Sequence, residues 1–286
     1  MSARQRKFAA TLQRLLLLYI AVHLAVDLTV GLPYPSWVGV VAAALVFGLG
    51  FVLGRSARRA FEAAGSPAPV EIDPPVTGRW SALNSPADKV PSHGTHGFGQ
   101  TYAIDIVAEP AEGLTRPAFA WLWPVARRNR AFPAFGAPLL AVADATVVHA
   151  EDGQRDHLSR NSLPGVLYLM VGEGFGRSMG GARRIVGNHV VLDLGEGTYA
   201  AYAHVRQGSL AVRAGDKVLA GQVLGQCGNS GNSTEPHVHF QLMDGPDLDT
   251  ARGIPFTWRG VGVPANREVF TAGEAAGVTA TGEAAA

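Results

Sequence analysis

Two apolar runs near the start of the sequence constrain this chain most strongly. Leu15 to Leu32 and Trp37 to Gly54 are each about 18 residues long, close to the shortest helix that spans a bilayer. The short stretch Pro33-Tyr34-Pro35-Ser36 separates them. We therefore expect a membrane anchor over residues 1–59, built as a helical hairpin with transmembrane helices at about 15–32 and 37–54.

The first run is less suited to a membrane than the second. It contains His23 and Asp27, and an aspartate at the centre of a membrane helix costs about 2.5–3.5 kcal/mol. The two side chains are four residues apart and can hydrogen-bond, which would reduce that cost. The segment could instead lie at the membrane interface. A cleaved signal peptide fits less well, because no clear cleavage site precedes the second run.

Basic residues flank the hairpin on both sides and are absent from its turn. They are Arg4, Arg6, Lys7 and Arg14 before it, and Arg55, Arg58 and Arg59 after it. The positive-inside rule then predicts that both ends, and with them the rest of the chain, face the cytoplasm.

The remainder of the sequence has the pattern of a mainly β domain. Residues 60–75 have the composition of a linker, residues 76–271 contain short apolar runs broken by Gly, Pro and Asp, and residues 272–286 have the low complexity of a disordered tail. The expected strands are Tyr102–Val107, Leu139–His149, His189–Leu194, Thr198–Val205, Lys217–Leu219 and Val238–Leu242.

Composition excludes several classes of function. A formal net charge of +1 gives no basic surface for nucleic acid. The single Cys227 rules out an internal disulfide and a cysteine-rich zinc site, and we expect it to be a small buried residue. Composition does not indicate an oligomeric state.

Two segments interrupt the strand pattern. Phe119–Phe135 mixes tryptophans with arginines, which is typical of a packed surface loop but also of a segment that touches a membrane or lines a groove. Gly153–Gly187 is long, rich in glycine and includes the apolar patch LPGVLYLM. Long insertions of this kind are often functional or mobile.

The stretch EPHVHFQL places His237 and His239 two residues apart in a strand-like run, so both side chains point to one face. Alone, such a pair is more often two half-exposed histidines than a metal site. Three further residues change that balance. His204 ends the strand-like TYAAYAHV, and His93 or His96 precedes Asp105, whose carboxylate lies in the apolar run YAIDIV and needs a partner.

A His/Asp/His set of this kind can supply three metal ligands with an open fourth position, as catalytic zinc sites do. The sequence contains no His-Glu-x-x-His, which excludes the helical arrangement with its glutamate base. We expect His149, His157 and His189 to lie at the surface or at strand edges.

The ordered motifs resemble the LytM/lysostaphin-type zinc metallopeptidases. They are His93…Asp105, Tyr202-Ala203-His204, Gly215-Asp216-x-Val218-x-x-Gly221-Gln222, Gly228-Asn229-Ser230-Gly231 and His237-Val238-His239. The resemblance implies an antiparallel, two-sheet, groove-bearing β fold and an endopeptidase that acts on peptidoglycan stem peptides or cross-bridges. It implies Zn²⁺ as cofactor, held by His93, Asp105 and His239.

By the same resemblance, His237 and His204 are the two catalytic histidines that do not bind the metal. His237 would take a proton from water, and His204 would donate a hydrogen bond to the oxyanion. The spacing between His93 and Asp105 is longer than usual for the family, which indicates a variant subgroup and leaves His96 as the second choice of ligand.

Two other functions compete with this reading. Some relatives keep the fold but serve as a regulatory or binding module, although all five site residues are present here. The segment GDKVLAGQVLG resembles a lipoyl-carrier hairpin, but Lys217 begins a strand instead of sitting at a hairpin tip. A peptidoglycan hydrolase must act outside the cytoplasm, which conflicts with the charge pattern. The site motifs favour a membrane-anchored, extracytoplasmic domain.

Overall fold

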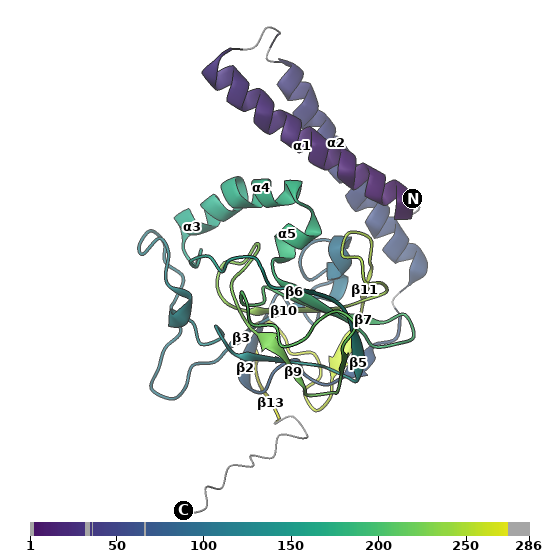
Figure 1. Ribbon diagram of the computed structural model, residues 1–286, viewed down its shortest axis with the longest axis vertical. Coiled ribbons are helices and arrows are strands. Elements are labelled where there is room, and N and C mark those ends of the chain that lie inside the picture. The colour runs from purple at the N-terminus through teal and green to yellow at the C-terminus, as the bar shows by residue number, and fades with distance from the viewer. Residues whose placement is uncertain (1–2, 32–34, 36, 66, 274–286) are drawn as a thin grey trace, which may run out of the picture.

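The computed structural model describes residues 3–31, 35, 37–65 and 67–273, and shows a helical hairpin above a mainly β domain (Figure 1). Its elements in chain order are α1 (Ala3–Thr29), α2 (Trp37–Ala64), β1 (Val70–Ile72), β2 (Gly78–Leu83), η1 (Gly97–Tyr102), β3 (Ile104–Ala108), η2 (Asn129–Ala131), β4 (Pro138–Leu140), β5 (Ala145–Glu151), α3 (Leu163–Tyr168), η3 (Leu169–Glu173), α4 (Gly174–Met179), α5 (Ala182–Val186), β6 (His189–Asp193), β7 (Tyr199–Ala203), β8 (Lys217–Val218), β9 (Val223–Gln226), β10 (Val238–Met243), β11 (Gly253–Ile254), β12 (Phe256–Trp258) and β13 (Val269–Ala272).

The helices α1 and α2 pack against each other and are both long and apolar enough to cross a membrane. Each is longer than the sequence indicated. The helix α1 begins at Ala3, and α2 continues past Gly54 to Ala64, because the residues after Gly54 are good helix formers with an Arg58–Glu62 ion pair at i, i+4. The turn between the two helices lies mostly outside the described residues.

The large antiparallel sheet positions the candidate site residues of β3 and β10. It contains nine strands in the order β13-β2-β3-β10-β7-β6-β5-β8, with β11 pairing β10. All its ladders are antiparallel, whereas the small β1–β12 pair is parallel and β4–β9 forms a separate antiparallel pair. The expectation of a mainly β, antiparallel fold is confirmed.

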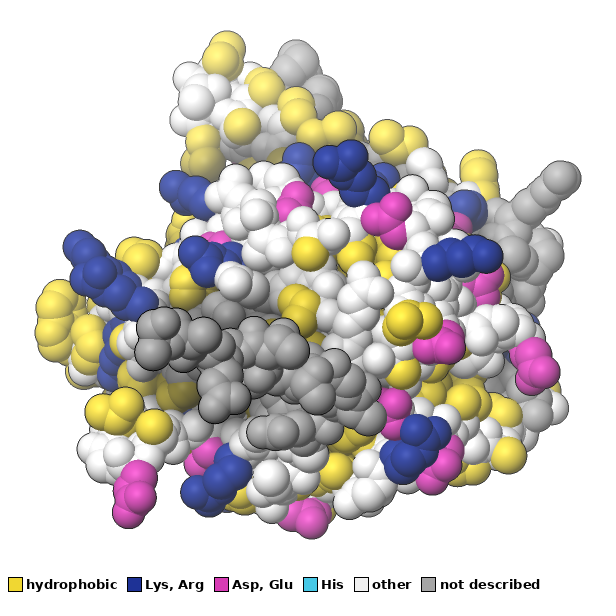
Figure 2. Space-filling model, turned by 60° about the horizontal axis from the view of Figure 1, so that its bottom comes forward, with side chains coloured by type: hydrophobic (Ala, Val, Ile, Leu, Met, Phe, Trp, Pro, Cys, Tyr) yellow, Lys and Arg dark blue, Asp and Glu magenta, His cyan; other side chains and the backbone are white. Residues whose placement is uncertain are grey.

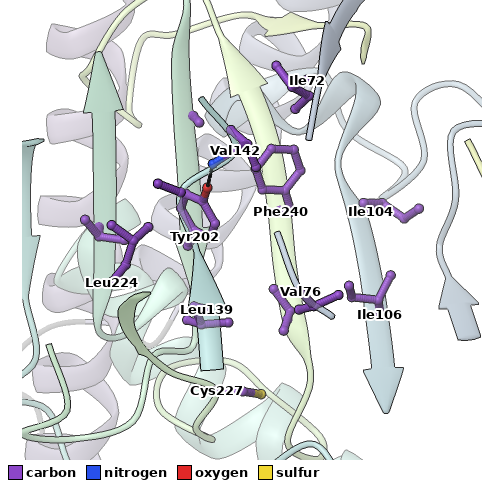
Figure 3. Close-up of a cluster of buried hydrophobic side chains, with 14 of the residues drawn as sticks. Ile72, Val76, Ile104, Ile106, Leu139, Val142, Tyr202, Leu224, Cys227 and Phe240 are labelled. Carbon is purple, nitrogen blue, oxygen red and sulfur yellow. Dashed lines mark hydrogen bonds between the residues drawn. The ribbon is translucent and has the colours of Figure 1, made fainter. Parts of the chain in front are cut away.

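Alternation along the strands separates the core from the functional face. In β10, Phe240 is fully buried in the main core with Tyr202 of β7 and Ile104 of β3 (Figure 3). Their neighbours His239 and Asp105 point to the opposite face because successive strand residues alternate. The buried Tyr202 hydroxyl donates to Leu140 O at 2.9 Å and accepts from Val142 N at 3.1 Å, so its polar atom is satisfied.

Several expected boundaries differ from the structure. Leu139–His149 is not one strand: β4 ends at Leu140 and β5 starts at Ala145, because the backbone at Ala141 and Val142 bonds to Gln222 and Tyr202. Residues 60–75 contain the end of α2 and all of β1. Of the expected tail, residues 274–286 lie outside the described residues.

The Gly153–Gly187 insertion is largely helical. From Leu163 to Met179, α3, η3 and α4 follow one another without a break, and Ser162 caps this run by accepting from Gly165 N at 3.0 Å. The helix α5 packs Ala182 and Val186 against Ala201 and Ala203 of β7 on the functional face. The small side chains of β7 leave room for this helix directly on the sheet.

Candidate metal centre

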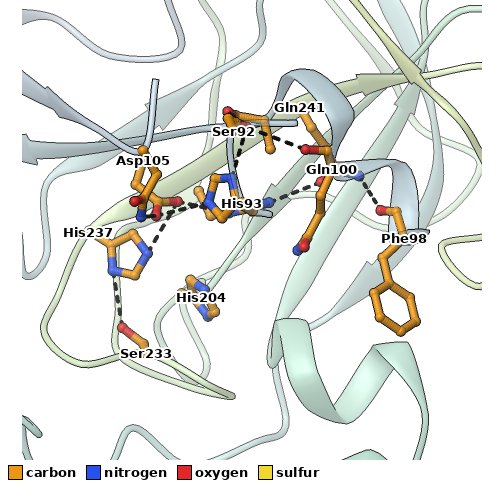
Figure 4. Close-up of polar contacts among 12 residues, drawn as sticks. Ser92, His93, Phe98, Gln100, Asp105, His204, Ser233, His237 and Gln241 are labelled. Carbon is orange, nitrogen blue, oxygen red and sulfur yellow. Dashed lines mark hydrogen bonds and ion pairs between the residues drawn. The ribbon is translucent and has the colours of Figure 1, made fainter. Parts of the chain in front are cut away.

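Asp105 is buried beside His93 and His237, with His204 nearby (Figure 4). It pairs with His239 across the β3–β10 ladder, and its Oδ1 is 2.8 Å from His239 Nδ1. Its Oδ2 is 3.0 Å from His93 Nε2 and accepts from Asn84 Nδ2 at 2.8 Å. The buried carboxylate expected from the apolar run YAIDIV therefore has polar side chains close to both of its oxygens.

The hydrogen bonds around His93 determine which of its nitrogens carries the lone pair. Ser92 Oγ donates its only hydrogen to Ala103 O at 2.6 Å. Because that hydrogen is used, Ser92 Oγ accepts from His93 Nδ1, which is 3.0 Å away. A neutral His93 therefore directs the lone pair of Nε2 at Asp105.

The same reasoning applies to His239. Gln241 Nε2 donates to Phe98 O at 2.7 Å, which fixes the orientation of its amide. Gln241 Oε1 then accepts from His239 Nε2 at 3.0 Å, leaving the lone pair on Nδ1, toward Asp105. Phe98 has a φ of +59°, a strained value for a non-glycine residue, and this backbone places its carbonyl against Gln241.

Three acceptors therefore converge without a hydrogen between them. The ligand atoms of His93, Asp105 and His239 all lie within 4.8 Å of one another. The lone pairs of two neutral histidine nitrogens repel the carboxylate oxygens that they face, unless a cation lies between them. Nitrogen and carboxylate oxygen are ligands that zinc prefers, and an outer hydrogen bond on each histidine is typical of metal sites. The residues fit a metal ion.

His237 and His204 lie beside this cluster. His237 Nε2 is 3.5 Å from Asp105 Oδ1, and its ring centroid is 4.8 Å from that of His204. His237 Nδ1 is 2.8 Å from Glu235 O, and His204 Nδ1 is 2.8 Å from Ser230 O. Since a carbonyl oxygen can only accept, both Nδ1 atoms carry hydrogens, and both Nε2 atoms hold lone pairs when the rings are neutral.

The backbone around His204 is constrained. Its φ is +59°, and its N–H donates to Val186 O at 3.0 Å while its carbonyl accepts from Gly228 N at 2.9 Å. Gly231 has a φ of +70°, and a Cβ there would lie 2.4 Å from Gly187 N. The glycine-rich turn, Gly228–Gly231, is therefore in close contact with the end of α5. This contact holds His204 over the site.

Charge and burial shift the pKa values of the site in different directions. Burial lowers the pKa of His204 well below its usual value, and the neighbouring His237 and His239 lower it further. Burial would lower the pKa of His237, but the Asp105 carboxylate outweighs it and raises that pKa. Burial would raise the pKa of Asp105, but His237 and His93 hold it well below its usual value.

The remaining histidines lie elsewhere. His96 stacks on Phe61 of α2, with ring centroids 4.5 Å apart, and its Nδ1 is 3.2 Å from Thr101 Oγ1. The structure thus brings His93, and not His96, to Asp105. His157 and His189 are buried, contrary to the expected surface positions, because Gly231 O and Gly187 O each satisfy one of their ring nitrogens. Cys227 is buried, as expected.

Gln241 and Ser92 are two polar residues of this site that sequence reasoning missed. Gln241 follows His239 by two residues, so the alternation that pairs His237 with His239 also puts Gln241 on the functional face. Nothing in the local sequence signals the role of Ser92, because its partner Ala103 is a backbone carbonyl.

Comparison with known proteins finds similarity to one family of peptidases over part of the β domain. Residues 171–250 match the model of Peptidase family M23, a range that includes His204, His237 and His239 but not His93 or Asp105. Over this range the chain is similar to the LytM/lysostaphin-type peptidases.

Two curated relatives match over short segments. The glycyl-glycine endopeptidase ALE-1 of Staphylococcus capitis is 41% identical over 58 residues, and the peptidoglycan DD-endopeptidase ShyA of Vibrio cholerae is 39% identical over 57. Each match spans 20% of this chain, but only 16% and 13% of the respective relatives. The catalytic domain of lysostaphin from Staphylococcus simulans aligns with a TM-score of 0.31 at 22% identity, covering 56% of this chain and 76% of that one.

Proposed function

We propose that this chain is a membrane-anchored zinc metalloendopeptidase that hydrolyses peptide bonds in peptidoglycan. The observation that carries the proposal is the convergence of three metal-binding acceptors, from His93, Asp105 and His239, beside two further histidines. The peptidoglycan substrate follows from the relatives, which are named for endopeptidase activity on glycyl-glycine and peptidoglycan bonds.

His93 Nε2, one or both oxygens of Asp105, and His239 Nδ1 would hold the metal. Zinc in such a site supplies Lewis acidity, which polarises a carbonyl group and makes water acidic enough to ionise near neutral pH. The outer contacts of Ser92 and Gln241 would keep both ligand rings in the orientation and tautomer that binding requires.

His237 is suited to the role of general base. Glu235 O holds its Nδ1 hydrogen, so Nε2 can accept a proton from an attacking water on the Asp105 side of the ring. The negative charge of Asp105 favours the protonated ring that results. The proton can then pass to the amine of the departing peptide.

His204 can take part in two ways that depend on its protonation. In the neutral ring Nε2 is an acceptor, so it can orient a hydrogen of the attacking water. It can donate to the oxyanion of a tetrahedral intermediate, as the family resemblance implies, only after Nε2 has received a proton. The constrained backbone of His204 would keep Nε2 in place in both states.

A cavity lined in part by Glu235, whose carbonyl contacts His237, could receive part of a peptide. It has a volume of about 490 Å³ and is lined by Arg116, Phe119, Asn161 and Glu235 among others. Glu235 forms an ion pair with Arg116, and its backbone carbonyl holds His237, so this cavity adjoins the proposed base. Since the substrate lies outside the cytoplasm, we propose that α1 and α2 anchor an extracytoplasmic domain.

The proposal is tested by incubating the full chain, in detergent with zinc supplied, with purified peptidoglycan and analysing soluble products by mass spectrometry. His239→Ala is the control, and zinc content is measured for both proteins. New peptide fragments from the wild type alone would support the peptidase and identify its bond. Zinc binding without fragments, across several wall chemistries, would reject hydrolysis and leave a regulatory or binding module.

A further inference from the structure

The helical insertion exposes apolar side chains on the face that it turns away from the domain. Leu167, Met170 and Val171 are 54%, 71% and 75% exposed, whereas Leu169 between them is buried. Together with Leu163 they follow the spacing i, i+4, i+7 and i+8, which defines one side of a helix. The outward side of a surface helix is ordinarily polar, whereas this helical run is apolar on both its buried and its exposed side.

A second exposed apolar segment lies next to the first. Trp121, Leu122 and Trp123 are 74%, 71% and 83% exposed. The backbone on either side of them is tied to the start of α3: Leu163 N donates to Ala120 O at 3.0 Å, and Ser162 Oγ donates to Val125 O at 2.6 Å. We call the exposed residues of these two segments the apolar strip.

The helical run that carries part of the apolar strip reaches the hairpin. The helix α4, at the other end of the helical run, packs against α1. Asp249 connects α1 with α5, because its Oδ1 accepts from Arg14 of α1 at 2.6 Å and from Ala182 N of α5 at 3.4 Å. Figure 1 shows the run from α3 to α4 lying along the side of the domain that faces the hairpin.

Aromatic and basic residues accompany the strip. Tyr168 is 59% exposed within the helical run, and Trp and Tyr are enriched where proteins meet the membrane–water interface. Arg128, Arg130 and Arg184 are exposed nearby in sequence, and arginine attracts anionic lipid headgroups. Figure 2 shows hydrophobic side chains beside Lys and Arg at the left edge of the molecule, the edge where Figure 1 draws the long loop between β3 and β4.

We propose that the apolar strip is a membrane-contact surface, which lies in the headgroup region of the bilayer crossed by α1 and α2. We infer that a lipid bilayer covers this surface, because the apolar strip lies near two membrane-length helices and combines apolar, aromatic and arginine side chains. An interfacial helix of this kind inserts about 5–10 Å into the headgroup and acyl boundary. This proposal rests on the membrane anchoring proposed above and is independent of peptidase activity.

The test measures the depth of single positions in the full chain, reconstituted in vesicles that contain anionic lipid. Leu122→Cys and Val171→Cys are labelled with an environment-sensitive fluorophore and quenched by lipids spin-labelled at shallow or deep acyl positions. Phe51→Cys, 69% exposed on α2, is the reference position inside the membrane. Val269→Cys, 47% exposed on β13 at the far end of the domain, is the apolar control off the strip (Figure 1).

The native thiol does not interfere with this labelling. Cys227 is buried, and burial raises the pKa of its thiol, so the unmodified chain serves as the unlabelled blank. We expect Leu122 and Val171 to be quenched most by the shallow spin label, Phe51 most by the deep one, and Val269 by neither.

Three results would overturn the proposal. If Phe51 is quenched while Leu122 and Val171 behave like Val269, the domain stands away from the bilayer. If Val171 cysteines cross-link between copies without quenching, the strip is an interface with a second copy. If Phe51 itself is not quenched, the hairpin is not inserted, and the strip has no membrane to contact. Peptidoglycan hydrolysis, measured on the same preparations, would separate these failures from a failure of the peptidase.

Discussion

Asp105 and His239 face each other across the β3–β10 ladder, with Oδ1 and Nδ1 2.8 Å apart. Their positions are set by the register of two buried strands, so the sheet itself fixes two of the three candidate ligands. His93 comes from the segment before η1 and depends on local hydrogen bonds instead. This division predicts different responses to substitution in the two parts.

Gln241 should control metal affinity without contacting the metal. Gln241→Met removes the acceptor that fixes the His239 tautomer, and we expect zinc affinity to fall about 10- to 100-fold. Gln241→Glu keeps an acceptor for His239 but loses the donor to Phe98 O, so its loss should be smaller. Competition with a chromophoric chelator measures both. An unchanged affinity in Gln241→Met would show that the amide does not position His239.

His93 and His96 form a matched pair that tests the ligand assignment. His93→Ala should abolish tight zinc binding, because it removes one of three ligands. His96→Ala should leave zinc bound, because His96 contacts Phe61 and Thr101 and not Asp105. Zinc content after dialysis distinguishes them. Loss of zinc in His96→Ala with retention in His93→Ala would reverse the assignment.

Phe240 should contribute strongly to stability. It is fully buried, and its ring meets Tyr202, Phe256 and Trp258. Phe240→Ala should lower the free energy of unfolding by about 3–5 kcal/mol through lost burial and a cavity. Val269→Ala, at a half-exposed strand position, is the control, with a change of about 0.5 kcal/mol or less expected. Urea denaturation in detergent measures both, and equal effects would contradict this account of the core.

His189 predicts a loss of stability in acid. Burial lowers its pKa to about 4 in the folded chain, against about 6.5 when unfolded. Between these values the unfolded state binds a proton that the folded state does not, so stability falls as pH decreases. At pH 5 the loss is about 2 kcal/mol relative to pH 7.5. His189→Gln should have a smaller difference between its urea midpoints at the two pH values, and an equal difference would contradict the pKa shift.

The sequence was sufficient for the elements whose pattern is local. The alternation around Phe240 predicts β10. The position of Asp105 within an apolar run indicates, before any fold is known, that its carboxylate is buried with a partner. It could not supply the contacts that depend on register, such as Asp105 with His239. It also misjudged Leu139–His149, because the bonds that interrupt this run come from Tyr202 and Gln222, far away in the chain.

The buried histidines show the same limit. His157 and His189 have nothing in their neighbouring residues that distinguishes them from surface histidines. They are buried because Gly231 O and Gly187 O lie within hydrogen-bond distance, and those carbonyls are placed by the contact between α5 and the glycine-rich turn. The pairing of His93 with Asp105 across an unusual spacing likewise depends on a loop conformation that sequence alone does not specify.

Lys7 and Arg14, which come before the first apolar run, form ion pairs with Asp247 and Asp249 of the β domain. Residues on the two sides of the hairpin can touch only if they share a compartment. If the β domain lies outside the cytoplasm, as proposed above, the basic end of α1 must cross the membrane with it, against the direction that its charges favour. A topology reporter placed beside Lys7 would consequently also report the compartment of His239.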